Sequence, residues 1–287
     1  MTSFYITVLA GVIALGAILV DASRRNTLFF RYLEGLAKPT RGGVTVVVVA
    51  YVLVLWQSAV SVALVSPTYL PAPESVLAAL ASMLRTNILL PAIAISVGRA
   101  LFAFGIAAVV GVGLGSVSGA FPGFSVVVLP TNSALRYIPP TAFIALTILW
   151  LGIGEAEKIS LIILGILFYV LQMTADAVRA VPRVLIEAAQ TLGARRWEIF
   201  RKVVLPFAFP DILAVLRVNL GAAWTFLVVA ELISADRGLG HILSSSQRFL
   251  QTPTMFAVIL VLGFMGYLTD SLAALLINYS ARWRRTL

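Results

Sequence analysis

Seven apolar runs divide this sequence, and each is about as long as a helix that crosses a membrane. They cover approximately residues 4–20, 43–65, 92–118, 124–151, 159–178, 212–233 and 255–278. A helix needs about 20 apolar residues to cross a hydrocarbon core of ~30 Å. Sixty per cent of the residues are hydrophobic and only 11% are charged, whereas soluble domains average roughly 45–50% apolar and 25% charged. The sequence therefore predicts an all-α, polytopic membrane protein.

The fourth run is the least regular, because Pro130, Pro139 and Pro140 interrupt it. A proline inside a helix removes a hydrogen bond and bends the axis. We expect a broken or kinked span here. The segment 66–91 should hold a turn followed by a short amphipathic helix on the outer surface, since its prolines precede an apolar run that starts near Glu74.

The basic residues predict the orientation of the chain, because short loops rich in Lys and Arg stay in the cytoplasm. Segments 21–42, 179–211 and 279–287 hold 14 Lys and Arg residues, and the alternate loops hold 4. We therefore expect the N-terminus outside and the C-terminus in the cytoplasm. The first run lacks the preceding basic residues of a signal peptide, which favours a retained helix over a cleaved one.

Composition also excludes several functions. The net charge of +9 comes from basic residues between the apolar runs, where they contact anionic lipid, so nucleic acid is not expected as a partner. The chain has no cysteine, which removes thiolate chemistry and disulfides. His241 has no companion histidine, so no metal site is expected. No nucleophile, base and oxyanion donors fall into a catalytic pattern, so the chain is not expected to be an enzyme.

The most informative stretch is residues 187–206, in the most basic inside loop. It reads Glu-Ala-Ala-Gln-Thr-Leu-Gly-Ala-Arg-Arg-Trp-Glu-Ile-Phe-Arg-Lys-Val-Val-Leu-Pro. Helical spacing places apolar residues on one stripe, with charges on other faces. The stripe comprises Ile186, Ala189, Gly193, Trp197, Phe200 and Val204. Gly193 should permit a bend or a close backbone approach, and Pro206 should end the helix. Periodicity alone also fits an interfacial helix on anionic lipid.

This stretch resembles the EAA loop of ABC importer permeases: Glu-Ala-Ala, three residues, Gly, nine residues, then Ile-x-Leu-Pro. Only Val203, in place of Ile, departs from it. The resemblance covers about residues 66–285 and is closest to the nitrate, sulfonate and taurine branch. Further matching segments are Leu70-Pro71-Ala72-Pro73, Arg136-Tyr137-Ile138-Pro139-Pro140, Trp150-Leu151-Gly152-Ile153-Gly154-Glu155, Ala230-Glu231-Leu232-Ile233 and Arg237-Gly238-Leu239-Gly240.

The resemblance implies a type I ABC importer permease: a bundle of six core transmembrane helices, here with one extra N-terminal helix. Residues 1–42 would form that helix and a basic loop, and residues 43–287 the transmembrane domain, with the coupling loop at 183–206. The implied partners are a second, identical permease copy, a cytoplasmic ABC ATPase dimer and an extracytoplasmic binding protein. The chain lacks the phosphate-binding loop Gly-x-x-x-x-Gly-Lys-Ser/Thr. It therefore needs no cofactor itself, and ATP and Mg belong to the ATPase.

By the same resemblance, the loop carries the residues that couple the permease to the ATPase. They are Glu187, Ala188, Ala189, Gly193, Ala194, Arg195, Trp197, Leu205 and Pro206. The apolar stripe would supply the packing, while Glu187, Arg195 and Arg196 would add charged contacts. Ordinary solvated charges on a cytoplasmic helix remain the alternative for those three.

Ionisable residues inside spans are costly and are candidates for the pathway or its gate. Arg136, beside Pro139 and Pro140, is the strongest, as a contact for an anionic substrate or a partner for free carbonyls. Arg99 is a weaker candidate. Arg217 and Glu231 are two more candidates for the gate. The structural alternative for Arg217 is an ion pair with Asp176 or Asp270, and for Glu231 it is an ordinary carboxylate at the outer interface.

Glycines in the third run should allow close helix packing, since Gly111 and Gly115 form a Gly-x-x-x-Gly pattern. The function predicted is the import of a small, anionic solute such as a sulfonate, taurine or nitrate. Bicarbonate and thiamine or riboflavin precursors are alternatives within the family. A gradient-driven transporter or channel is the alternative outside it, but such a carrier has no use for a docking helix.

Overall fold

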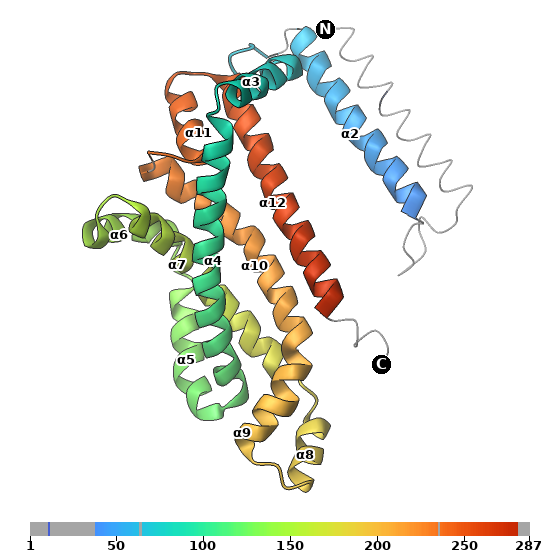
Figure 1. Cartoon of the computed structure of the whole chain (residues 1–287), viewed down its shortest axis with the longest axis vertical. Coiled ribbons are helices and arrows are strands. Elements are labelled where there is room, and N and C mark those ends of the chain that lie inside the picture. Colours follow the sequence, from blue (N-terminus) through green and yellow to red (C-terminus); the bar gives the residue numbers. More distant parts are fainter. Residues whose placement is uncertain (1–10, 12–37, 63–64, 235, 281–287) are drawn as a thin grey trace. The chain divides into compact units, whose positions relative to one another are not determined.

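The computed structural model describes residues 11, 38–62, 65–234 and 236–280, and every regular element in that part of the chain is helical. The elements, labelled in Figure 1 where there is room, are α2 (Lys38–Ser61), α3 (Pro73–Arg85), α4 (Leu89–Ala120), α5 (Pro122–Leu135), the 3₁₀-helix η2 (Pro140–Phe143), α6 (Ile144–Leu151), α7 (Glu155–Arg179), α8 (Arg183–Thr191), α9 (Arg196–Ile199), the π-helix η3 (Phe200–Val204), α10 (Leu205–Ser234), α11 (Leu239–Arg248) and α12 (Thr252–Ser280).

The expectation of a polytopic helical protein is confirmed. Among the described residues, four helical stretches are long and apolar enough to cross a membrane: Leu89–Ala120, Glu155–Arg179, Arg196–Ile233 and Thr252–Ile277. The apolar part of α2, Val46–Ser61, is shorter than these. The predicted first run lies outside the described residues apart from Gly11, so the full count of seven stays a prediction.

The fourth run is broken, as its prolines predict. Pro122–Leu135 and Pro140–Leu151 meet at an angle of 83°. Pro130 lies inside α5 without ending it. The break falls ahead of Pro140, where Pro139 adopts the extended conformation (φ −60°, ψ 130°) that a following proline favours.

The described residues fall into two compact units, and the larger comprises Leu84–Ser245 together with the chain from Val258 onward. Within it α4, α7 and α10 run side by side (Figure 1) and enclose the core. α4 contributes small side chains, α7 contributes large ones, and α10 contributes both. The core residues are Ala100, Ala103 and Ala107 of α4, Leu161, Ile162 and Ile166 of α7, and Ala223, Trp224, Leu227 and Ala230 of α10. Small facing large side chains lets the helices approach closely.

The predicted glycine contact joins α4 to α7. A Cβ added at Gly111 would lie 2.8 Å from Val170 Cγ1, and one at Gly115 would lie 2.5 Å from the Leu171 carbonyl oxygen. Gly119 continues the row, with 2.7 Å to the Ala175 carbonyl oxygen. Only glycine fits at these three positions, so the Gly-x-x-x-Gly pattern is a packing feature, as expected.

The smaller unit contains α2, most of α3 and Ser246–Ala257. The expected turn and short amphipathic helix are present, since α3 buries Val76 and Met83 and exposes its other face. Trp56 Nε1–H donates to the Pro71 carbonyl oxygen at 2.9 Å, and its ring lies 5.6 Å from that of Phe256. Thr252 Oγ1 donates to the Thr68 carbonyl at 2.7 Å. The Leu-Pro-Ala-Pro segment is thus held by α2.

Candidate functional site

The segment between α7 and α10 turns sharply at Gly193. α8 ends at Thr191, Gly193 adopts a left-handed φ of +78°, and α9 begins after Arg195. A Cβ on Gly193 would meet nothing within 4 Å, so the glycine serves the bend rather than a close approach. The backbone N–H of Arg195 donates to Glu198 Oε2 at 3.0 Å, which caps the start of α9.

The prediction that Pro206 ends this helix is wrong. α9 continues through the π-helical turn Phe200–Val204 into α10, and the whole stretch Arg196–Ile233 is long enough to cross a membrane. Pro206 is the second residue of α10. A proline lacks an N–H and conflicts with the carbonyl four residues earlier, and the wider π turn ahead of it accommodates both effects.

The predicted apolar stripe is confirmed only in part: Ile186, Ala189, Phe200 and Val204 come together, whereas Gly193 forms the bend and Trp197 is exposed. Ile186, Ala189 and Ala194 pack against an internal cluster that includes Phe200 and Val204. Other apolar residues of the segment remain exposed. They are Val184 (66% exposed), Leu192 (87%) and Trp197 (56%).

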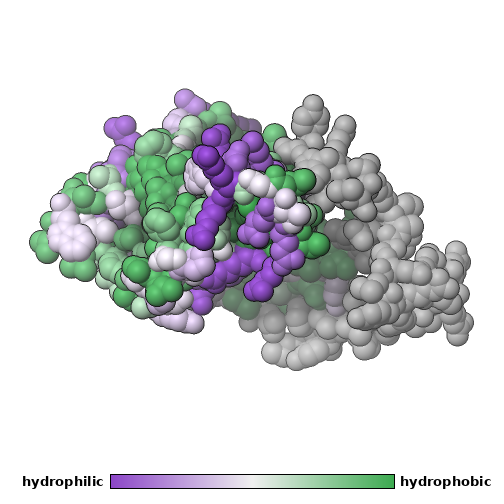
Figure 2. Space-filling view, turned by 90° about the horizontal axis from the view of Figure 1, so that it is seen from below, coloured by the Kyte–Doolittle hydropathy of each residue, from purple (hydrophilic) through white to green (hydrophobic). Residues whose placement is uncertain are grey.

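Glu187, Ala188 and Arg195 are exposed on the same segment, while Leu205 is half-buried and Pro206 exposed at the start of α10. The view from the α8 and α9 end shows hydrophilic side chains gathered together with hydrophobic ones beside them (Figure 2). We name residues 183–199 the docking segment. Its exposed surface combines charged and large apolar side chains, which suits it to bind a partner protein.

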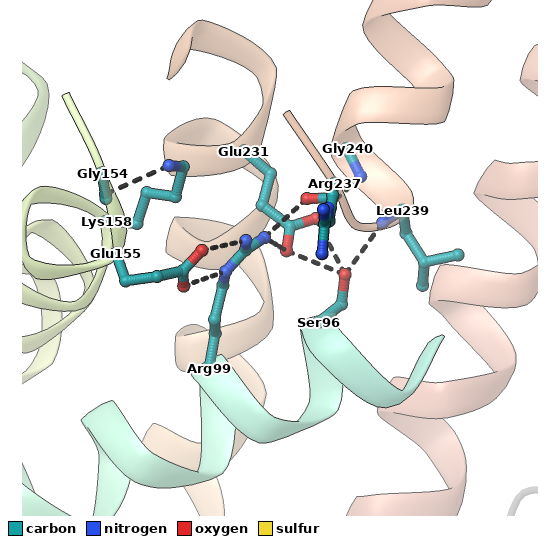
Figure 3. A network of polar contacts seen from close by, with 9 residues as sticks. All are labelled: Ser96, Arg99, Gly154, Glu155, Lys158, Glu231, Arg237, Leu239 and Gly240. Atoms are coloured by element: carbon teal, nitrogen blue, oxygen red, sulfur yellow. Dashed lines mark hydrogen bonds and ion pairs between the residues drawn. The ribbon is translucent and has the colours of Figure 1, made fainter. Parts of the chain in front are cut away.

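A second cluster of functional groups lies near the other end of α10. Arg99, on α4, has a side chain only 5% exposed, and its guanidinium bridges two carboxylates. Nη1 donates to Glu231 Oε1 and to the Arg237 carbonyl oxygen, both at 2.7 Å. Nε donates to Glu155 Oε2 at 2.6 Å, and Nη2 donates to Glu155 Oε1. We name this group the Arg99 network (Figure 3).

Glu231 is fully buried in this network and held by several donors. Ser96 Oγ–H donates to its carboxylate at 2.8 Å, and the Gly240 backbone N–H donates to Oε2 at 2.8 Å. The Leu239 backbone N–H in turn donates to Ser96 Oγ at 2.9 Å. The network therefore fixes the turn after α10 against α4.

Two glycines make this close packing possible. A Cβ at Gly238, whose φ is +112°, would lie 2.5 Å from Glu231 Oε1, and a Cβ at Gly240 would overlap the Glu231 Cβ. The Arg-Gly-Leu-Gly segment and the Glu231 segment therefore belong to one contact. Glu155, from a third segment noted in the sequence, joins them at Arg99.

Glu155 differs from Glu231 in its exposure. Its side chain is 60% exposed at the first residue of α7. Beside it lies an open cavity of about 450 Å³, lined by Arg99, Glu155 and Arg237 and by the apolar groups of Ala94, Ile95, Gly98, Phe102 and Ile159. The site thus presents a buried cation whose outer edge is covered by a solvent-accessible carboxylate.

The structure separates the other pathway candidates from this site. Arg136 lies at the break after α5, half-buried, with its guanidinium 5.2 Å from the Tyr137 ring centre. Pro139 is exposed and Pro140 half-buried beside the same break.

Arg217 pairs with Asp270 at 2.6 Å, and Asp270 is one of the two partners expected for it. Asp176 instead accepts from Gln172.

Sequence reasoning brought Arg99 and Glu231 into one class of candidates but missed their partners. Ser96, Glu155 and the Arg237 carbonyl were not singled out as site groups. A signal was available, since a buried arginine needs a carboxylate and Glu155 and Glu231 are both placed by the predicted topology near the outer ends of spans. Arg136, ranked first, contacts no carboxylate among the described residues.

Fold and sites together define a polytopic helical membrane protein with a bent segment, exposing charged and large apolar side chains, between two spans. The chain belongs to the family described as "Binding-protein-dependent transport system inner membrane component", which matches residues 107–279. It is the membrane-spanning permease subunit of an ABC importer, and ATP hydrolysis resides in a separate subunit.

Its relatives include the taurine transport system permease protein TauC of Escherichia coli, 36% identical over 226 residues that cover 77% of this chain and 82% of that protein. A putative aliphatic sulfonates transport permease protein, SsuC of Bacillus subtilis, is 35% identical over 241 residues, 83% of this chain and 86% of that one. The fold is similar to that of a methionine ABC transporter, MetNI, solved in inward-facing conformations. The TM-score is 0.60 at 21% identity, over 68% of this chain and 97% of that chain.

Proposed function

We propose that this permease imports small organic sulfonates, with taurine and short alkanesulfonates as the first compounds to test. The observation that carries the proposal is the relatives' identity. Proteins named for taurine or aliphatic sulfonates are 35–37% identical to this chain over 77–83% of its length. A buried arginine beside an open cavity is in keeping with an anionic cargo.

The family implies an ATPase and a substrate-binding protein as partners. We further propose a homodimer of permease chains, the docking segment and C-terminus in the cytoplasm, and the N-terminus outside. The count of basic residues supports this orientation, because segment 179–211 is the richest in Lys and Arg. The Arg99 network would then lie in the outer half of the membrane.

We also propose that the ATPase binds the docking segment. Leu192, Val184 and Trp197 are exposed large apolar groups on a basic segment, and such groups are typical anchors of protein interfaces. Glu187 and Arg195 would add charge-assisted contacts around them. Because the α9 part of the segment continues through η3 into α10, a movement of the ATPase would be passed directly to a span.

The cargo is tested by uptake. Cells without their own sulfonate importers would express the permease with its ATPase and binding protein, and accumulation of labelled taurine would be measured. Unlabelled ethanesulfonate should compete, while nitrate and riboflavin should not. Riboflavin is included because a riboflavin permease is 34% identical over 54% of this chain. Uptake of labelled nitrate or riboflavin, without uptake of any sulfonate, would contradict the proposal.

The coupling role is tested by Gly193→Asp. Asp adopts a positive φ more readily than most residues do, so the backbone at Gly193 can be kept. The new carboxylate would nevertheless enter the proposed interface. The variant should reach the membrane in normal amount and lose co-purification with the ATPase. Gly123→Asp is the matched control, because a side chain there meets open space outside the docking segment. Equal ATPase recovery with both variants would refute the assignment.

A further inference from the structure

The guanidinium of Arg99 presents two different edges. One edge, at Nη1, is bound inside the protein by Glu231 and the Arg237 carbonyl. The other edge, formed by Nε and Nη2, is bound by both oxygens of Glu155. This second edge is the one that recognises carboxylates, phosphates and similar anions with two parallel hydrogen bonds.

The two carboxylates on Arg99 are not equally fixed. Glu231 has a fully buried side chain and accepts hydrogen bonds from Ser96 and Gly240 as well as Arg99. Glu155 is 60% exposed and its carboxylate hydrogen-bonds only to Arg99 among the described residues. Removing Glu231 would leave a buried cation poorly paired. Glu155 can turn into solvent at far smaller cost, provided that another anion replaces it.

The space for such an anion is already present. The cavity beside Glu155 measures about 450 Å³, within the ~300–1,000 Å³ typical of small-molecule sites. Ala94, Ile95, Gly98, Phe102 and Ile159 line it with apolar groups, and Arg99 and Arg237 contribute the cationic ones. A short alkyl chain could therefore pack on one side while its anionic head reaches Arg99.

A second cation lies close to the same position. Lys158, one turn along α7 from Glu155, is 2% exposed, and its Nζ donates to the Gly154 carbonyl at 3.1 Å. If Glu155 turns outward, the Nε–Nη2 edge of Arg99 loses both of its acceptors. An entering anion would take their place, and the nearby charge of Lys158 would add to the attraction.

We infer that the Nε–Nη2 edge of Arg99 is an anion-binding site within the permease, and that Glu155 is the resident counterion which a sulfonate or carboxylate head group replaces. The choice of sulfonate rests on the proposed function, whereas the site itself rests on the geometry above. The exchange needs no new buried charge, because one anion takes the place of another and Arg99 stays paired throughout.

The test uses a thiol as a reporter, since the chain has no native cysteine. Gly98→Cys places a thiol on the wall of the cavity, where an added side chain meets open space. The permease with its ATPase, in lipid nanodiscs without binding protein, would be treated with N-ethylmaleimide. Ethanesulfonate should slow the modification, while the neutral analogue ethanesulfonamide should not. Gly123→Cys, remote from the cavity, should react at a constant rate.

Two further variants assign the effect to the named groups. Glu155→Gln removes the competing carboxylate and should lower the half-protecting concentration of ethanesulfonate by about tenfold, the scale of one charged hydrogen-bonded pair. Arg99→Lys keeps the charge but loses the two-point edge, and should abolish protection. If Arg99→Lys fails to fold, the Glu155→Gln result decides alone.

Several results would overturn the inference. The first is equal protection by the sulfonate and the sulfonamide. The second is no protection at Gly98→Cys or at a second reporter, Ala94→Cys. The third is an unchanged half-protecting concentration of ethanesulfonate in Glu155→Gln. Failure of the proposed function would look different. It would appear as the absence of sulfonate uptake, whatever the protection data show. Sulfonate uptake without protection would contradict only the proposed site at Arg99.

Discussion

At the scale of residues, one guanidinium holds two carboxylates that differ in their surroundings. Arg99 and Glu231 are buried together, so each depends on the other for its charge to be tolerated. Glu155 is exposed to solvent and could lose Arg99 with little penalty. Equal-looking ion pairs in one network should therefore make unequal contributions to stability.

Glu231→Gln should lower the thermal midpoint of the detergent-solubilised permease by several degrees. The substitution leaves Arg99 without its buried counterion, a cost of about 1–3 kcal/mol for an unsatisfied buried partner. Glu155→Gln is the control and should lower the midpoint less, since the Glu155 side chain is 60% exposed and Arg99 keeps its buried partner Glu231. Thermal denaturation followed by intrinsic fluorescence measures both. Equal midpoints for the two variants would show that burial does not rank these carboxylates.

At the scale of elements, the contact between α4 and α7 depends on glycines, which have no side chain to separate the two helices. Gly111, Gly115 and Gly119 follow one face of α4 and meet the backbone of α7. Gly113 lies on the same helix in open space. The two classes of glycine share a sequence context but not a role, which provides a test within a single helix.

Gly115→Ala should destabilise the protein, because the new Cβ would lie 2.5 Å from the Leu171 carbonyl oxygen and 2.8 Å from Thr174 Cβ. Forcing the helices apart at a packed seam costs about 1–3 kcal/mol. Gly113→Ala should be neutral or slightly stabilising, as alanine is the better helix former. The measurement is the monodisperse fraction after size-exclusion chromatography, together with the thermal midpoint. A greater loss with Gly113→Ala would refute the assigned seam.

The elements themselves were largely predictable from the sequence. Apolar length fixes a span whatever its neighbours are, and prolines marked the break ahead of Pro140. The fate of Pro206 was not predictable, because a π turn depends on hydrogen bonds that adjust locally. The hydrogen-bond partners of Arg99 were not predictable from the sequence either. Its contacts come from α7 and from the turn after α10, and composition does not say which faces of separate spans meet.

At the scale of the molecule, α10 joins the two sites. The docking segment precedes it, and Glu231 lies near its end, about 39 Å from Leu205 at ~1.5 Å per residue. The continuous helical stretch Arg196–Ile233 therefore connects the end of the docking segment, our proposed contact for the ATPase, with the buried Arg99 network. Displacement at one end would bear on the ion pairs at the other.

The proposed orientation of the chain can be tested by labelling. Leu192→Cys, in the docking segment, and Ile153→Cys, ahead of α7, replace residues that are 87% and 71% exposed. A membrane-impermeant thiol reagent should label Ile153→Cys in intact spheroplasts and Leu192→Cys only after permeabilisation. The absence of native cysteine keeps the background low. The reverse pattern would invert the proposed topology.

The central claim is that this permease moves its cargo only when a separate ATPase acts on the docking segment. Proteoliposomes containing the permease and its ATPase, supplied with binding protein, would be assayed for accumulation of labelled taurine. The account predicts accumulation that requires hydrolysable ATP and the binding protein and that disappears with Gly193→Asp. Accumulation by the permease alone, driven by an ion gradient and unaffected by the loss of the ATPase, would contradict it.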